Sequence, residues 1–128
     1  MPLVHIALRD HHQAAVRQAI SEAVHQAMVD TINVPANDRF QIISAHQADE
    51  LIADPTYLDA ARSDDVVFIQ ITLNAGRTIE MKQALYKRIA ELVSTQAAIR
   101  AEDIIINLLE VSKEDWSFGN GEASYVSK

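Results

Sequence analysis

Two short stretches of this 128-residue chain, Val4-His5-Ile6-Ala7-Leu8 and Ile69-Gln70-Ile71-Thr72-Leu73, determine how the rest of it is interpreted. When the chain is aligned with itself at an offset of 65 residues, the two stretches coincide without a gap. At the same offset Arg17-Gln18-Ala19-Ile20 falls on Lys82-Gln83-Ala84-Leu85, and Asn37-Asp38-Arg39-Phe40 falls on Glu102-Asp103-Ile104-Ile105. Three segments that match at one offset predict an internal duplication.

Each half has the pattern strand, helix, strand. The two stretches quoted above are short and rich in β-formers, and the segments after them carry apolar residues at spacings of three and four, which is typical of an amphipathic helix. A second β-rich run follows each helix. The predicted strands cover residues 2–8, 40–45, 66–73 and 104–110, and the predicted helices cover 13–33 and 78–97. A connection that contains a helix implies parallel pairing of the two strands within each unit.

The sequence therefore predicts an α/β (α+β) fold in one domain, residues 1–128, built from a duplicated β-α-β unit. The units cover about 2–46 and 66–110, and together they form a four-stranded mixed sheet with two helices on one face. Asp10 with Gln13 is expected to cap the first helix, and Thr78 the second.

The segments outside the two units have less regular patterns. Residues 47–63 are a polar connector, and residues 111–128 form a C-terminal arm or a hairpin around Gly119-Asn120-Gly121. Nothing in the chain covers the second face of the sheet. An uncovered apolar face predicts a homo-oligomer in which these faces pack together.

Composition excludes several classes of function. The net charge is −7, with 11 basic residues scattered along the chain, so we expect no nucleic-acid partner. There is no cysteine, which rules out disulfides and thiolate chemistry. No apolar run approaches the ~18 residues of a spanning helix, so no membrane partner is expected and the predicted location is cytoplasmic.

The five histidines do not have the spacing of a metal site. His11 and His12 are adjacent and are expected to point apart, and His25 lies within the first predicted helix. His5 and His46 fall on strands, where cross-strand hydrogen bonding is the expected role. We predict no metal and no cofactor.

Three residues could carry chemistry. Pro2 would have a secondary amine at the chain terminus if Met1 is removed, and such a nitrogen can act as an acid or a base, depending on its surroundings. Arg77 precedes a helix, where a cation opposes the helix dipole, so it either bends into solvent or binds an anion together with the helix N–H groups. Asp38 begins the second strand and is either a turn carboxylate or part of a site.

These features together resemble the tautomerase superfamily. The resemblance extends over nearly the whole chain: a proline after the initiator methionine, a duplicated β-α-β unit and an arginine at the start of the second helix. Two stretches are more similar to malonate semialdehyde decarboxylase. These are Val34-Pro35-Ala36-Asn37-Asp38-Arg39-Phe40-Gln41 and Asp115-Trp116-Ser117-Phe118-Gly119-Asn120-Gly121.

The resemblance implies a homotrimer whose sheets face the centre, acting on a small carboxylate. Malonate semialdehyde would lose carbon dioxide to give acetaldehyde, with Pro2 as the general acid and Asp38 supporting it. Arg77 would hold the carboxylate. Trp116 and Phe118 would form the wall of the pocket.

The chain departs from this family in one place. The family has Arg-x-Arg in the loop before the second helix, whereas this chain has Ala75-Gly76-Arg77, with Asn74 or Ala75 in place of the first arginine. One cation fewer leaves an alternative open, in which Pro2 is the base of a keto–enol tautomerase or hydratase of a 2-oxo acid. A third hypothesis is a non-catalytic binding module.

Overall fold

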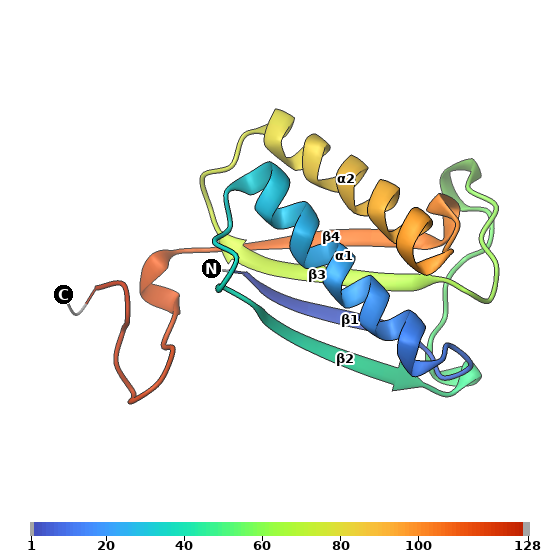
Figure 1. Cartoon of the computed structure of the whole chain (residues 1–128), viewed down its shortest axis with the longest axis horizontal. Coiled ribbons are helices and arrows are strands. Elements are labelled where there is room, and N and C mark those ends of the chain that lie inside the picture. The colour runs from blue at the N-terminus through green and yellow to red at the C-terminus, as the bar shows by residue number, and fades with distance from the viewer. Residues whose placement is uncertain (1, 127–128) are drawn as a thin grey trace.

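The computed structural model describes residues 2–126 and consists of two β-α-β units side by side (Figure 1). The first unit comprises β1 (Leu3–Arg9), α1 (Ala14–Ile32) and β2 (Phe40–His46), and the second comprises β3 (Val67–Asn74), α2 (Ile79–Ala97) and β4 (Ile104–Val111). Both helices have 19 residues, and α2 begins and ends 65 positions after α1. The offset read from the sequence is thus the offset of the folded units, and the duplication is confirmed.

The four strands form one mixed sheet in the order β2-β1-β3-β4. Within each unit the strands are parallel, as predicted, and the units join through the antiparallel pair β1 and β3. The register places Leu3 opposite Phe40 on one side and opposite Thr72 on the other. One end of the sheet therefore holds the starts of β1 and β2 and the ends of β3 and β4.

The core lies between the sheet and the two helices, which cover the same face (Figure 1). Alternate strand residues point into it and are fully or almost fully buried: Val4, Ile6, Leu8, Ile69, Ile71 and Leu73. The helices contribute the residues that their spacing predicted, among them Ile20, Val24, Leu85 and Ile89. Alternation in the strands and 3.6-residue periodicity in the helices thus meet in one apolar layer.

The two helix starts differ. Thr78 caps α2 as predicted, because its hydroxyl oxygen accepts the Met81 backbone N–H at 3.2 Å. Gln13 occupies the corresponding position of α1, but its side chain makes no capping hydrogen bond, so the cap predicted from Asp10 with Gln13 is wrong in that respect. At this end of α1 the Arg17 side chain instead donates a hydrogen bond to the His12 carbonyl.

The turn between β1 and α1 corrects a second expectation. The rings of His11 and His12 do not point apart; their centroids are 4.3 Å apart, with a 32° angle between the ring planes. The turn after Arg9 bends the backbone, so the alternation that separates neighbouring side chains on a strand does not apply. His5 behaves as predicted, since its Nε2 is 2.8 Å from the Ser44 hydroxyl on β2.

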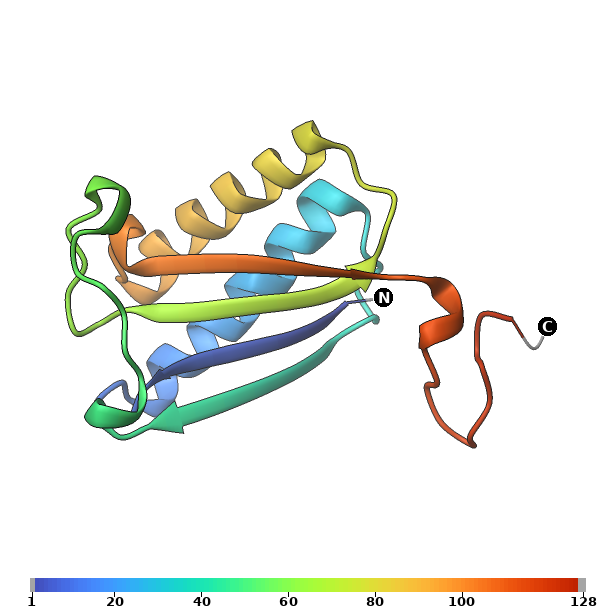
Figure 2. The ribbon, with the colours of Figure 1, turned by 180° about the vertical axis from the view of Figure 1, so that it is seen from behind.

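The C-terminal segment leaves β4 and extends beyond the end of the sheet (Figures 1 and 2). It forms a single short helix (Lys113–Asp115), and no strand is present among residues 112–126, so the predicted hairpin is wrong. Gly119, Asn120 and Gly121 all have positive φ, at 130°, 61° and 67°. They make a turn whose two sides are not paired as strands, because the segment packs through aromatic rings.

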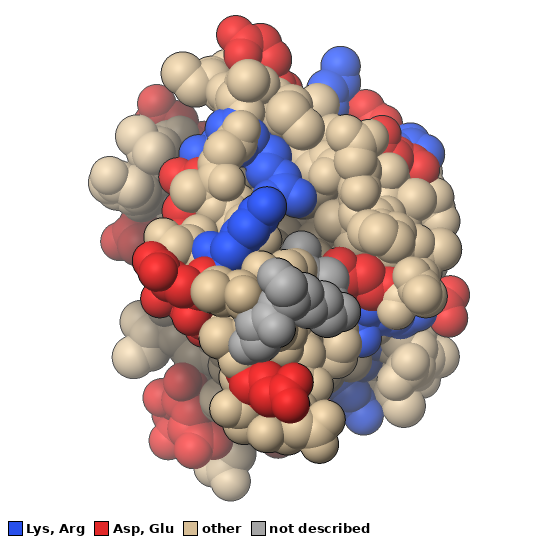
Figure 3. All heavy atoms as spheres, turned by 90° about the vertical axis from the view of Figure 1, so that its left-hand side faces the viewer, with Lys and Arg blue, Asp and Glu red and all other residues tan. Residues whose placement is uncertain are grey.

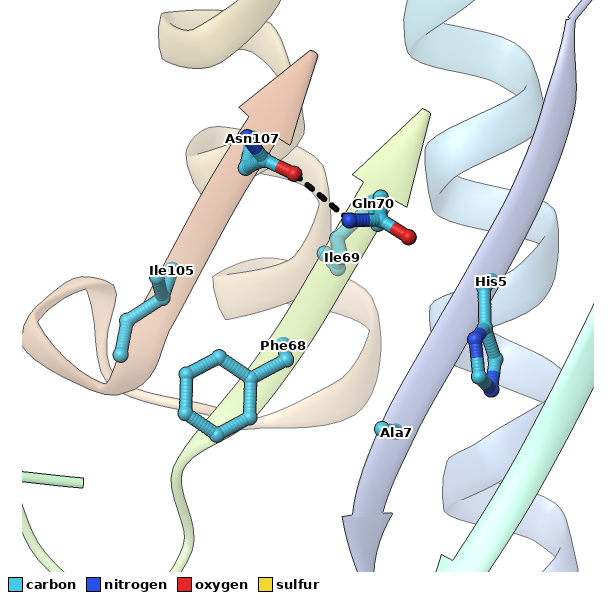
Figure 4. Close-up of a pocket in the computed structure, with 7 residues that line it drawn as sticks. All are labelled: His5, Ala7, Phe68, Ile69, Gln70, Ile105 and Asn107. Atoms are coloured by element: carbon cyan, nitrogen blue, oxygen red, sulfur yellow. Dashed lines mark hydrogen bonds between the residues drawn. The ribbon is translucent and has the colours of Figure 1, made fainter. Parts of the chain in front are cut away.

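The second face of the sheet is not covered by either helix (Figure 2). Phe40, Ile42 and Leu109 are between 44% and 51% exposed there. A hollow of about 280 Å³ lies on this face, and Gln70 donates a hydrogen bond to Asn107 at its edge (Figure 4). The residues lining it are His5, Ala7, Phe68, Ile69, Gln70, Ile105 and Asn107.

The helices of residues 2–126 include none that is both long enough and apolar enough to cross a membrane.

Candidate functional site

The predicted site residues come from four segments that converge at one end of the sheet. Because β1 and β3 are antiparallel, the N-terminal end of β1 lies beside the C-terminal end of β3. Pro2 directly precedes β1, and Asn74 is the last residue of β3. The C-terminal segment begins at this same end, after β4, so the turn that contains Asp38, the Arg77 loop and the aromatic segment all lie at the end of the sheet where Pro2 precedes β1.

Pro2 and Asp38 are both buried at this end, and Asp38 is only 5% exposed. Asp38 closes a turn in which its backbone N–H donates to the Pro35 carbonyl at 3.0 Å. Since Leu3 pairs with Phe40, the residues just before each strand lie at the same level of the sheet. Met1, whose removal would free the Pro2 nitrogen, lies outside the described residues.

The duplication offers a comparison for Asp38, because Asp103 occupies the equivalent position in the second unit. Asp103 is fully buried and accepts hydrogen bonds from the Ser63 N–H and hydroxyl, both at 2.7 Å, and from Arg100 at 3.2 Å. Asp103 therefore has a structural role, holding the connector to the second unit. Asp38 instead lies at the end where the chemistry-bearing residues converge.

Arg77 lies in the loop between β3 and α2, just before the Thr78 cap. Its Nη1 donates to the Asn74 carbonyl at 3.0 Å, which turns the guanidinium back over the end of β3. Gly76 makes this loop possible, because its φ of 127° lies in a region that side chains disfavour. The side chain of Arg77 is half-buried and does not extend freely into solvent.

Trp116 and Phe118 form one side of this end. Their rings stack with centroids 5.1 Å apart and an interplanar angle of 15°. The Trp116 Nε1–H donates to the Asn74 Oδ1 at 2.7 Å, which ties the aromatic segment to the end of β3. Phe118 also contacts Phe40 at the start of β2, with centroids 5.3 Å apart. The structure thus brings Trp116, Phe118 and Asn74 together at this end of the sheet.

Tyr125 belongs to the same group and was missed by the sequence analysis. Its ring meets Phe118 edge-on, with centroids 5.7 Å apart. Burial and the Asp38 charge raise the pKa of the Tyr125 hydroxyl, while Arg77 opposes that shift. Both charged site residues therefore act on this hydroxyl. The one sequence feature that could have indicated this role is the position of Tyr125, an aromatic residue shortly after the glycine turn at 119–121.

The local charge differs from that of the whole chain. Figure 3 looks onto this end, where Lys and Arg side chains form a group with Asp and Glu side chains around it. Lys82, in the first turns of α2, pairs with Glu110 near the end of β4 at 3.2 Å. A chain with a net charge of −7 thus carries a group of cations at this end of the sheet.

This combination of fold and site matches a family of known enzymes. Two family models, each described as tautomerase enzyme, match residues 2–61 and 38–119. The "probable tautomerase" YusQ of Bacillus subtilis is 41% identical over 126 residues, which covers 98% of this chain and 99% of that protein. The chain belongs to the tautomerase superfamily.

Solved structures of other proteins have the same fold as this member of the superfamily. A malonate semialdehyde decarboxylase inhibited by 3-bromopropiolate superposes with a TM-score of 0.92 and 40% identity, covering 98% of this chain and 95% of the other. A fused 4-OT described as a symmetric trimer has a TM-score of 0.79 at 24% identity, covering 98% and 99%. The predicted duplicated β-α-β fold and the predicted superfamily are both confirmed.

Proposed function

We propose that this tautomerase-superfamily member decarboxylates malonate semialdehyde to acetaldehyde and carbon dioxide without a cofactor, using Pro2 as the general acid. The observation that supports this most strongly is the Trp116–Asn74 hydrogen bond, which fixes an aromatic wall beside the end of the sheet where Pro2 and Asp38 are buried. The similarity to a malonate semialdehyde decarboxylase over 98% of the chain agrees with this assignment.

Pro2 supplies the proton in this scheme. Asp38 is buried at the same sheet end, and its proposed role is to support the charged form of the prolyl amine, because a nearby carboxylate favours that form. The ammonium then polarises the C3 carbonyl of the 3-oxo acid by a hydrogen bond. The pair of electrons from the C1–C2 bond moves into the enolate as carbon dioxide leaves, and protonation at C2 gives acetaldehyde.

Arg77 and Asn74 orient the substrate. The guanidinium has five N–H donors, so the bond to the Asn74 carbonyl leaves others for a carboxylate. The Asn74 side chain uses its oxygen for Trp116, and its amide N–H groups remain as donors. An amide in place of a second arginine binds a carboxylate without adding charge.

Trp116 and Phe118 make the site less polar. Carbon dioxide is neutral whereas the carboxylate is strongly solvated, so a wall that excludes water favours loss of the carboxylate. Tyr125 extends this wall, and its raised pKa keeps the hydroxyl protonated as a hydrogen-bond donor.

The second candidate function is keto–enol tautomerisation, or hydration, of a small 2-oxo acid with Pro2 as the base. The relative named as a probable tautomerase and the single arginine of the loop favour it. The two functions differ in the protonation state of Pro2, so they are distinguishable by pH profile as well as by substrate.

The test begins with the intact mass of the untagged protein, which reports whether Met1 has been removed. Wild type, Pro2→Ala and Arg77→Ala are then assayed with malonate semialdehyde and with phenylenolpyruvate. We expect decarboxylation by wild type, a loss of about 100-fold or more in kcat for Pro2→Ala, and a raised KM with a lowered kcat for Arg77→Ala.

Arg88→Ala is the matched control, because Arg88 pairs with Asp30 and Glu91 on the helix surface and should leave both activities unchanged. Turnover of phenylenolpyruvate alone would select the tautomerase. Equal turnover by wild type and both site variants would refute the proposed site, and no turnover of either substrate would favour a binding module.

We also propose that the chain assembles as a homotrimer through the uncovered face of the sheet. Phe40, Ile42 and Leu109 expose large apolar side chains there, and such a face is stable in water only when it is covered. The fused 4-OT with the same fold is described as a symmetric trimer, which supports this number of subunits.

A further inference from the structure

A group of metal-ligating side chains lies at the opposite end of the sheet from Pro2. His11 and His12 follow β1, and Asp65 precedes β3. One ligand atom from each of the three lies within 4.8 Å of the others, and the His11 Nε2 is 2.7 Å from the Asp65 Oδ1. This end is roughly 20 Å or more from Pro2, since the seven residues of β1 separate them.

His12 differs from the other two members of the group because its side chain is buried. It is only 6% exposed, and its Nε2 is buried with no hydrogen-bond partner among residues 2–126. A buried ring nitrogen without a partner loses its hydration and gains nothing in return. Such a nitrogen beside a second imidazole and a carboxylate indicates a ligand that completes the group.

The chemistry of the three side chains selects the ligand. A metal binds to the neutral imidazole ring, and His12 offers its ring from a buried position that is only 6% exposed. Two imidazoles and one carboxylate suit zinc, which commonly takes three protein ligands and a water. Arg17, which donates to the His12 carbonyl, is the nearby cation that opposes binding, and Asp65 offsets it.

Small movements of the side chains would allow the three ligand atoms to bind one ion. Zinc–ligand distances of about 2.0–2.2 Å place donor atoms about 3.5 Å from one another. The His11 Nε2 and the Asp65 Oδ1, now 2.7 Å apart, must therefore separate slightly to admit an ion, and any pair of ligand atoms near the 4.8 Å limit of the group must approach. The side chains of His11 and Asp65 are 47% and 57% exposed and are free to make this adjustment, while buried His12 stays in place.

We propose that His11, His12 and Asp65 form a Zn²⁺ site that fastens the β1–α1 turn to the segment entering β3. The duplication indicates that this group is a site separate from the one around Pro2. At the offset of 65 residues, His12 in the first unit corresponds to Arg77 in the second. The group therefore lies before α1, in the position that the Arg77 loop of the proposed catalytic site occupies before α2. The proposed role is structural and does not depend on the proposed decarboxylase activity.

The test measures binding of Zn²⁺ itself by calorimetry to the untagged, chelator-treated full chain, together with Tm in the presence and absence of zinc. We expect one zinc per chain at micromolar concentrations and a higher Tm with zinc, because an ion that binds only the folded state stabilises it. His11→Ala and Asp65→Asn each remove one exposed ligand and should weaken zinc binding more than about tenfold.

Two variants serve as controls that should keep wild-type affinity. Asp64→Asn changes the adjacent carboxylate, which is 98% exposed, and His46→Ala changes a histidine outside the group. Absence of saturable zinc binding at micromolar concentrations, or equal affinity in all five proteins, would overturn the proposal. Pro2→Ala leaves this zinc affinity unchanged, so a failure here is separate from a failure of the proposed catalytic function.

Discussion

The Trp116 indole N–H donates to the Asn74 side-chain oxygen at 2.7 Å, across 42 positions of the chain. This bond joins the C-terminal segment to the last residue of β3 and so positions both the aromatic wall and the Arg77 loop. Together with the contact between the Phe118 and Phe40 rings, it holds the wall against the sheet.

Loss of this bond is expected to lower activity in a non-additive way. Trp116→Phe keeps an aromatic ring but removes the donor, so it should reduce kcat/KM by about tenfold, an effect of about 1.4 kcal/mol. Asn74→Ala removes the acceptor together with the amide donors proposed to bind the substrate, so it should lose more. The double variant should lose little more than Asn74→Ala alone, because the bond to Trp116 is already broken in that single variant. Strictly additive losses in this double-mutant cycle would show that the bond does not position the wall.

Tyr125→Phe tests whether the Tyr125 hydroxyl contributes to activity in addition to the packing of its ring. The pKa of Tyr125 is raised, so the hydroxyl is protonated throughout the neutral range and acts as a donor. The variant keeps the edge-on contact with Phe118 and should lower kcat/KM by about tenfold, the loss of one hydrogen bond, with unchanged Tm. Tyr86→Phe, on the surface of α2, is the control. Equal activity of Tyr125→Phe and wild type would limit Tyr125 to packing.

Asp103→Asn is expected to destabilise the fold in a pH-dependent way. Burial alone would raise the pKa of Asp103, but hydrogen bonds from Ser63 and Arg100 outweigh it and hold the pKa below its usual value. A carboxyl group whose folded pKa is lowered contributes stability that is fully present above the unfolded pKa of about 4 and is lost as the pH falls through the folded pKa.

We therefore expect Asp103→Asn to cost about 2 kcal/mol at pH 7 and less at pH 3, measured by denaturant unfolding. Glu102→Gln is the control, because Glu102 is the exposed neighbour of Asp103. A cost that stays constant from pH 7 to pH 3 would contradict the assigned ionisation of Asp103.

Ile42→Asp tests the assembly. Ile42 is 51% exposed on the uncovered face of the sheet, and a buried unpaired carboxylate there would oppose association. Sedimentation of wild type should give a trimer at micromolar concentration and the variant a smaller species. Ile79→Asp introduces the same charge at a 70% exposed position in the first turn of α2 and should stay trimeric. A monomeric wild type would refute the proposed interface.

The fold was predictable because the two units repeat the same apolar positions. Val4 and Ile69 lie at equivalent positions and are both buried, so a pattern visible twice in the sequence fixed the strands, the helices and their order. The hydrogen bonds of single side chains were harder to predict from the sequence. Thr78 and Gln13 occupy equivalent cap positions, but the hydroxyl of threonine is short enough to reach the backbone N–H, whereas the longer glutamine side chain makes no such bond.

The errors have a common physical origin in segments outside the periodic elements. Gly119-Asn120-Gly121 has the composition of a hairpin turn, yet the residues on either side pair through Phe118 and Tyr125 rings rather than as strands. The ring contact of His11 with His12 depends on the bend after β1, and Tyr125 reaches Asp38 and Arg77 only through the path of the C-terminal segment. The periodicity of apolar residues contains no information about the bend after β1 or about the path of the C-terminal segment.

The aromatic wall follows the last strand and contributes nothing to the core, whereas Pro2, Asp38 and Arg77 are held by the duplicated units themselves. The proposed acid and the proposed anion-binding arginine therefore lie in a different part of the chain from the proposed wall. We expect that exchanging the segment after Val111 between relatives changes substrate preference and leaves the fold of the two units intact.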